Sequence, residues 1–171
     1  SVTALGNGSY VVASSFWYNG AAYQAGAVTW GDGARGITGT VSSANSLVGT
    51  QENDAVGSDS VTALSNDNYV VSSSHWGNGA AGHAGAVTWG NGAIGITGTV
   101  STANSLVGSR VGDRVGFPNA QALSNGNYVV NLATGLTNFA GESFINFENL
   151  VTGDGDDTVT GTSAKNALTT N

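Results

Sequence analysis

An internal repeat constrains this chain more than any other feature of its sequence. Residues 1–59 and 60–118 align without a gap and differ at 18 positions. A third stretch starts as AQALSNGNYVV at residues 120–130 and diverges after Asn131. The period therefore predicts two full units (residues 1–59 and 60–118), a partial third unit that begins with a hairpin (residues 119–142), and a separate C-terminal segment (residues 143–171).

Each full unit contains four short apolar stretches, separated by turns rich in Gly and Asn. In the second unit these stretches are residues 61–64, 68–73, 84–89 and 96–100. The turn between the first two is polar, and Asn and Gly tolerate the positive φ that tight hairpin turns need. No window has the sustained apolar spacing of a helix. We therefore predict an all-β chain of four-stranded antiparallel units, with Trp30 and Trp89 of the third strand in the core.

Composition and charge exclude several classes of protein. Glycine accounts for 27 of the 171 residues, but without the three-residue period of collagen. Hydrophobic content of 40% argues against disorder, and no apolar stretch is long enough to span a membrane. Four basic residues against eleven acidic ones give a net charge of −7, which makes nucleic acid an unsuitable partner.

The cellular location is predicted from what the sequence lacks. There is no cysteine, which disulfide-permissive compartments allow but do not require, and only one lysine. Many large secreted bacterial proteins avoid cysteine, and the scarcity of lysine fits them too. The first residues also have neither an initiator Met nor the charged and apolar regions of a signal peptide, so we expect a mature or excised segment of a longer protein. The predicted location is extracellular, on a bacterial cell surface.

Three stretches resemble the FG-GAP repeat of integrin-α-type β-propellers. They are the loop Gly108–Gly116, the hairpin Leu64–Ser73 and the strand Gly85–Trp89. The runs NGNYVV, GAVTWGNG and NSLVG are also similar to repeats of this length in giant secreted bacterial proteins. This resemblance covers residues 1–131 and implies propeller-like, four-stranded antiparallel blades. FG-GAP hairpins often bind Ca²⁺ through several acidic residues, whereas only Asp67 is acidic in the hairpin turns here, so plain turns are the better interpretation.

The number of units bears on how such blades would be arranged. Propellers usually close with four to eight blades, and two units plus a hairpin cannot close alone. We therefore expect an open array, or a ring completed by oligomerisation. Unpaired edge strands in such an array favour self-association by strand addition.

The C-terminal segment resembles the entry into an RTX-type β-roll. Residues 143–171 form three lines in which Leu150, Val159 and Leu168 share a column. Gly153, Gly155 and Asp157 match the glycine and aspartate positions of the middle line, which implies calcium there. Asn166 replaces the next aspartate, and each ion of such a roll lies between successive turns. The alternative interpretation is an apolar edge strand followed by an acidic, solvated turn.

Several other motifs are weaker candidates for chemistry. GDGARG at 31–36 and GNGAIG at 90–95 match a dinucleotide-binding pattern, but each leads towards a predicted strand rather than a helix. His75 and His83 could hold a metal, although the first unit has Phe16 and Gln24 in their places. Asp54 and Asp113 recur before Val-Gly, and we expect them to accept backbone N–H groups in their loops.

The strongest candidates for ligand binding lie on the loop after each hairpin. Trp17 and Asn19 recur there as Trp76 and Asn78. An indole face can stack on a sugar while an amide binds its hydroxyl groups, so these four residues could bind glycans. The alternative interpretation is that each Trp packs between neighbouring units.

Together these patterns predict a non-enzymatic protein without a required cofactor. Its predicted role is that of a structural or adhesive repeat module of a secreted bacterial surface or matrix protein, with self-association as the mechanism. The first alternative is a carbohydrate-binding module that uses the loop tryptophans. The second is a calcium-responsive accessory domain of a type I-secreted protein.

Overall fold

The computed structural model describes residues 1–131, 149–151 and 167–169, and all secondary structure in these residues is β. Repeat 1 (residues 1–59) and repeat 2 (residues 60–118) fold alike. The strands of repeat 1 are β1 (Val2–Ala4), β2 (Tyr10–Ser14), β3 (Ala27–Gly31) and β4 (Ser46–Val48). Those of repeat 2 are β5 (Ser60–Ala63), β6 (Tyr69–Ser73), β7 (Ala86–Gly90), β8 (Gly98–Thr99) and β9 (Ser105–Val107). The predicted all-β fold of tandem repeats is confirmed.

Each repeat forms an antiparallel sheet in the same register. Repeat 1 has the order β1-β2-β3-β4, and repeat 2 has the order β5-β6-β7-β9. Val12 lies opposite Thr29 in the first sheet, and Val71 lies opposite Thr88 in the second. The side chains of Thr29 and Ser46 are hydrogen-bonded, 2.7 Å apart, and tie the third strand to the fourth; Thr88 and Ser105 repeat this bond.

The fourth strand of each sheet is not the one that the sequence predicted. Residues 96–100 were expected to close the second unit, but Ser105–Val107 does so instead. Gly98–Thr99 pairs in parallel with β4 and so becomes the fifth strand of the sheet of repeat 1. Gly98 N–H donates to Ser43 O at 2.9 Å, and Val100 N–H donates to Val48 O at 3.1 Å. An apolar period of two identifies a strand, but it carries no information about which sheet the strand joins.

The hairpin turns form as the sequence predicted. Leu5 N–H donates to Ser9 O at 2.8 Å, and Leu64 and Leu123 make the same bond in their own hairpins. The third hairpin consists of β10 (Ala120–Ala122) and β11 (Tyr128–Val130). Gly8, Asp67 and Gly126 have φ values of 85°, 67° and 86°, a region that Gly adopts without strain.

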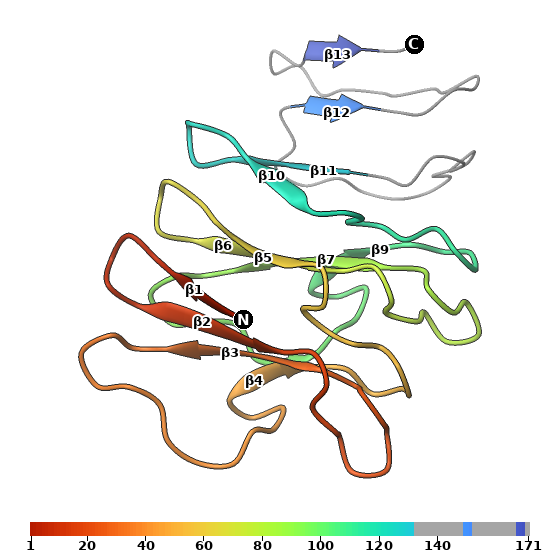
Figure 1. The fold of residues 1–171 in the computed structure, drawn as a ribbon. Helices are drawn as coiled ribbons and strands as arrows, with labels where there is room; N and C mark the ends of the chain where they lie inside the picture. The colour runs from red at the N-terminus through yellow and green to blue at the C-terminus, as the bar shows by residue number, and fades with distance from the viewer. Residues whose placement is uncertain (132–148, 152–166, 170–171) are drawn as a thin grey trace.

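The hairpins lie one above another and the sheets stack in a single direction (Figure 1). Thr3 Oγ1 donates to Val61 O at 3.2 Å, and Thr62 Oγ1 donates to Ala120 O at 2.9 Å. Each step of the stack therefore uses the same threonine. The described residues form an open stack and no closed propeller ring, so the resemblance to propeller blades holds only for the antiparallel sheet of each repeat.

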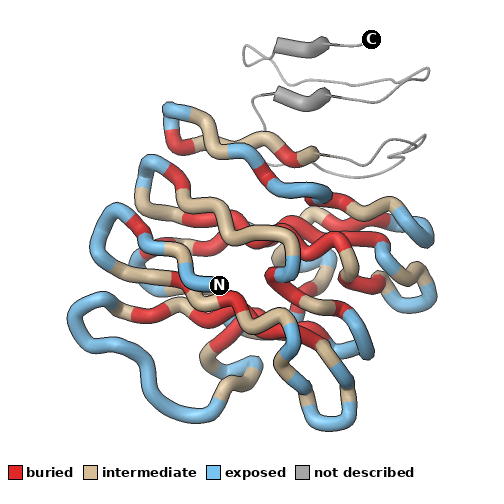
Figure 2. Tube along the Cα trace, viewed as in Figure 1, coloured by how far each residue is buried: buried red, intermediate tan, exposed pale blue. Residues whose placement is uncertain are grey.

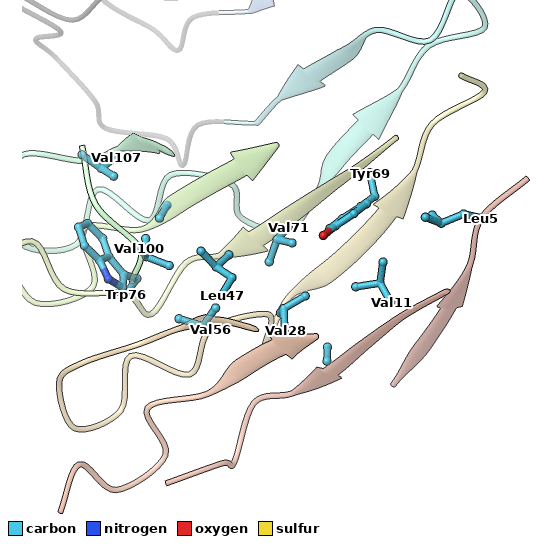
Figure 3. Packing of buried hydrophobic residues seen from close by; sticks show 12 residues of the cluster. Leu5, Val11, Val28, Leu47, Val56, Tyr69, Val71, Trp76, Val100 and Val107 are labelled. Carbon is cyan, nitrogen blue, oxygen red and sulfur yellow. The ribbon is translucent and has the colours of Figure 1, made fainter. Parts of the chain in front are cut away.

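The core lies between the sheets. We call the face that carries Tyr10 or Tyr69 the N-side face of its sheet, and the opposite face the C-side face. Val11 and Val28 of the C-side face of repeat 1 pack against Tyr69 and Val71 of the N-side face of repeat 2 (Figure 3). A second cluster joins the C-side face of repeat 2 to the hairpin β10–β11. Figure 2 shows the same pattern, with buried residues inside the stack and exposed ones at the loop tips.

Beyond the stack, the described residues include one further strand pair. β12 (Asn149–Val151) and β13 (Ala167–Thr169) are parallel, with Leu150 opposite Leu168. These two leucines share a column in the predicted nine-residue lines. Val159 of that column lies outside the described residues, as do the candidate calcium ligands Gly153, Gly155 and Asp157. In the part of the chain that the structure describes, there is no helix that could cross a membrane.

Candidate functional site

The candidate ligand-binding residues lie on a small loop that has the same backbone in both repeats. Asn19 and Ala22 exchange two backbone hydrogen bonds, of 3.2 and 3.0 Å, and Asn78 and Ala81 do the same at 3.0 Å. Gly26 N–H donates to Trp17 O at 3.0 Å and closes the loop at its base. Trp17 and Asn19 therefore lie on one such loop, and Trp76 and Asn78 lie on the corresponding loop of repeat 2.

Both asparagine amides donate to the backbone of their own repeat. Asn19 Nδ2 donates to Gly49 O at 2.8 Å, and Asn78 Nδ2 donates to Gly108 O at 3.0 Å. These bonds fix the loop against the residues that follow β4 or β9. Each bond uses one of the two N–H groups of the amide, so the second N–H and the amide oxygen are left for a sugar hydroxyl.

The two tryptophans differ in burial although they occupy the same loop position. Trp76 is only 6% exposed and belongs to the core cluster between the two sheets. Trp17 is partly exposed, because repeat 1 has no sheet against its N-side face in the described residues. In this arrangement Trp76 packs between units, and only Trp17 presents indole surface. Glycan binding by the four residues stays a prediction.

Three exposed aromatic side chains lie on the same loop as Trp17, and none of them was predicted as a ligand-binding residue. Phe16, Tyr18 and Tyr23 are 72%, 55% and 41% exposed. The rings of Tyr18 and Tyr23 meet edge to face, with centroids 5.1 Å apart. The second repeat has His75, Gly77 and Gly82 at these positions. The sequence signal for these aromatic residues was that the loop differs between the two repeats while the strand residues on both sides of it are nearly identical.

The loop of repeat 2 brings its two histidines together. The rings of His75 and His83 have centroids 5.3 Å apart, and His75 Nδ1 lies 3.3 Å from Ser58 Oγ. No group of three or more His, Cys, Asp or Glu side chains suited to a metal ion occurs within residues 1–131. The pair therefore supplies two ligands at most, short of the three or four protein ligands of a zinc site.

Two aspartates hold the loops that connect the repeats, as the sequence predicted. Asp54 is 1% exposed, and its Oδ2 accepts the N–H groups of Thr50 and Gln51, each at 2.8 Å. Its Oδ1 accepts Gly77 N–H of the next repeat at 3.0 Å. Asp113 makes the first two bonds in its own repeat, to Ser109 and Arg110. The Asp54 carboxylate thus acts as a structural clamp between repeats.

The strand tryptophans have different environments. Trp30 packs against the core cluster, and its Nε1 donates to Gly92 O of repeat 2 at 3.0 Å. Trp89 is 42% exposed, so the prediction that it lies in the core was wrong. The reason is tertiary, since repeat 2 covers Trp30 with its loop 90–95, whereas no corresponding loop among the described residues covers Trp89. The loop GNGAIG is therefore a packing element for Trp30, and Asn91 and Gly95 form an isolated bridge across it.

One family model matches this chain. It describes a repeat of unknown function, DUF5650, and it matches residues 4–58 and 63–117. These segments fall within the two full units and cover more than half of the chain. No curated protein and no solved structure matches the chain. The chain accordingly belongs to the family of DUF5650 repeats and carries two copies of the repeat.

Proposed function

We propose that this chain is a non-enzymatic structural or adhesive repeat module of a secreted bacterial surface or matrix protein. Its mechanism is self-association through strand edges, and the observation that carries the proposal is the pairing of β8 with β4. Through this pairing one repeat completes the sheet of another. Strand addition gives backbone hydrogen bonds irrespective of side chains, and the facing sheets add apolar contact.

The composition of the contact surfaces supports this role. The eight strands β1 to β7 and β9 contain no charged residue. Facing copies therefore meet without like-charge repulsion, while the acidic residues of the repeats lie on loops and turns. In the sheet of repeat 2, β9 pairs with β7 and has no strand on its other edge among the described residues. Completion of the stack by further copies, as an open array or a propeller-like ring, belongs to the same proposal.

The test is the mass of the full chain in solution over a wide concentration range. Self-association predicts a mass that increases with concentration and an unchanged result in EDTA. A strictly monomeric chain at all concentrations would refute the self-association mechanism. A mass that falls on addition of EDTA would favour the calcium-responsive alternative, whose candidate ligands are Gly153, Gly155 and Asp157.

A carbohydrate-binding module is the second candidate, because of the exposed aromatic residues on the loop of Trp17. Phe16, Tyr18 and Tyr23 are exposed on the loop that carries the partly exposed Trp17, and flat aromatic surfaces of this kind suit sugar stacking. A glycan array with the full chain tests this, with Tyr18→Ala and Tyr23→Ala as variants. Repeat 2 has the still smaller Gly77 and Gly82 at these positions, so the fold should tolerate the alanines. Absence of binding by the parent chain would end this alternative.

A further inference from the structure

The N-side face of repeat 1 has the residues of a buried interface but is partly uncovered. Its members are identical in both repeats: Val2, Ala4, Tyr10, Val12, Ser14, Trp17, Ile37, Val41 and Val48. In repeat 2, the corresponding Tyr69 and Val71 are fully buried, and Trp76, Val100 and Val107 are at most 6% exposed. In repeat 1, Tyr10, Val12, Trp17 and Val41 are partly exposed and Val2 is 69% exposed. The same face is therefore covered in repeat 2 and open in repeat 1 over β1, β2 and the loop residues, whereas Val48 at its other end is only 1% exposed.

On the same side of repeat 1, a segment that could add a strand to a neighbouring sheet has no sheet edge to pair with among the described residues. The sequence GITGTV occurs at residues 36–41 and again at 95–100. In repeat 2 it supplies β8, and the N–H groups of Gly98 and Val100 donate to the edge of the first sheet. In repeat 1 the same residues form no strand, and Ile37 to Thr40 are exposed. The amides of Gly39 and Val41 make no backbone hydrogen bond to described residues.

Two serines of repeat 1, Ser14 and Ser15, correspond to the serines of repeat 2 that bind the segment connecting the two repeats. In repeat 2, Ser73 Oγ accepts Gly57 N–H at 3.0 Å, and the Asp59 carboxylate accepts from the backbone N–H and Oγ of Ser74. Gly57 and Asp59 lie just before the first strand of repeat 2. The equivalent hydroxyl groups of Ser14 and Ser15 have no hydrogen-bond partner among the described residues.

We propose that the N-side face of repeat 1 is a docking site for the C-side face of one further repeat of this family, covalently joined to repeat 1 by a Gly-Ser-Asp connection. The inference rests on the proposed structural function and names the partner of that surface. Residues 36–41 would pair in parallel with the β4-type edge of the new repeat. Its connection would bind Ser14 and Ser15, as Gly57 and Asp59 bind Ser73 and Ser74.

A second copy of this chain fits the face less well. The position that β1 and β2 would take on the C-side face of repeat 2 is already held by β10 and β11, where Ala120 and Val130 pack against Val70 and Val87. A docking copy would therefore have to displace this hairpin. A covalently joined repeat meets no such obstacle, because the junction between repeats 1 and 2 is already its template.

The experiment adds a copy of residues 1–59 directly before Ser1 of the full chain. This reproduces the Asp59–Ser60 junction of the present chain. Amide hydrogen exchange is then compared between the parent and the extended chain at a dilution at which both are monomeric. We expect exchange at Gly39 and Val41 to slow at least about tenfold in the extended chain. Gly98 and Val100, which are hydrogen-bonded in both proteins, serve as internal references.

The matched variant is Val12→Asp, introduced in repeat 1 of the parent and at the same residue of repeat 1, not of the added copy, in the extended chain. In the parent it changes a partly exposed position, and we expect a small shift of the urea midpoint. In the extended chain the same change buries an unpaired carboxylate, so it should abolish the added protection at Gly39 and Val41. Val71→Asp places the charge in the existing interface and should destabilise both proteins. A shift of equal size for Val12→Asp in both proteins would contradict the docking.

The remaining outcomes separate this inference from the proposed function. Unchanged exchange at Gly39 and Val41 in the extended chain would overturn the docking site, whatever the mass of the parent. Protection of these amides that rises with the concentration of the parent would show that a second copy takes the face, and would overturn the covalent partner. A monomeric parent with a protected extended chain would refute self-association and leave the docking site standing.

Discussion

Repeats 1 and 2 form a comparison within one molecule. Their N-side faces carry the same residues, but only repeat 2 has a sheet packed against that face in the described residues. Tyr69 is fully buried and its hydroxyl oxygen accepts Ile96 N–H at 3.2 Å, whereas Tyr10 is partly exposed. The difference shows that the neighbour, rather than the residue type, determines burial in such a stack. Matched substitutions in the two repeats test this dependence on the neighbour.

The largest expected effect is on the loop tryptophans. Trp76→Ala removes a side chain that is 6% exposed from the core between the sheets. It should lower the free energy of unfolding by about 3–5 kcal/mol, the usual cost of such a cavity. Trp17→Ala, at the partly exposed position, should cost less than half as much. Urea denaturation of both variants checks this, and equal losses would contradict the proposed dependence on the neighbour.

The next largest effect is on the aspartate clamps. Asp54→Ala leaves three backbone N–H groups without their acceptor, one of them from the next repeat. Hydrogen bonds to charged groups contribute about 1.5–3 kcal/mol each, but water can replace the acceptor at the exposed Thr50 and Gln51 and not at the buried Gly77, so we expect a loss of about 3 kcal/mol. Asp113→Ala should cost about half of that, since Asp113 joins only its own loop in the described residues. A larger loss for Asp113 than for Asp54 would be inconsistent with the clamp.

Alkaline pH probes the buried tyrosine. Burial raises the pKa of Tyr69 from 10.0 to about 12, which the Ile96 hydrogen bond only partly offsets. The unfolded chain therefore loses this proton first, and stability should fall above pH 10 by about 1 kcal/mol per pH unit. Burial also raises the pKa of Tyr128, which acts in the same direction. Tyr69→Phe should reduce this slope without removing it, whereas Tyr10→Phe serves as the control. Urea titrations from pH 9 to 12 measure the slopes.

The smallest effect is expected at the surface turn of repeat 1. The pKa of Asp32 is lowered, chiefly by the hydrogen bond from Ala34 N–H, and Asp32 also pairs with the exposed Arg35 at 3.1 Å. In repeat 2, Asn91 Oδ1 accepts Ala93 N–H at 2.8 Å in the same way. Asp32→Asn should therefore leave the urea midpoint at neutral pH unchanged. The parent chain should lose a little stability as the pH falls below the usual range of carboxylate pKa values. Asp32→Asn should remove this small loss.

Much of the fold could be predicted from the sequence, because the relevant signals are local. Polar turns with residues that tolerate positive φ, such as Asp67 and Gly126, identified the hairpins. The recurrence of Asp54 as Asp113 identified loops held by carboxylates. The candidate site was harder to predict, because a sequence does not show what covers a residue. Trp17 and Trp76 have the same local motif, and only the stacking of repeat 2 on repeat 1 buries Trp76.

The sequence by itself determined the repeat, the all-β fold, the hairpins and the uncharged strands of both sheets. Only the tertiary structure decided where the segment GITGTV would pair. Its two copies are identical, but Gly98–Thr99 is a strand and the corresponding residues of repeat 1 are not. The physical reason is that a β-strand needs a hydrogen-bonding partner outside itself. The edge of β4 supplies that partner to the second copy, and no described edge supplies it to the first.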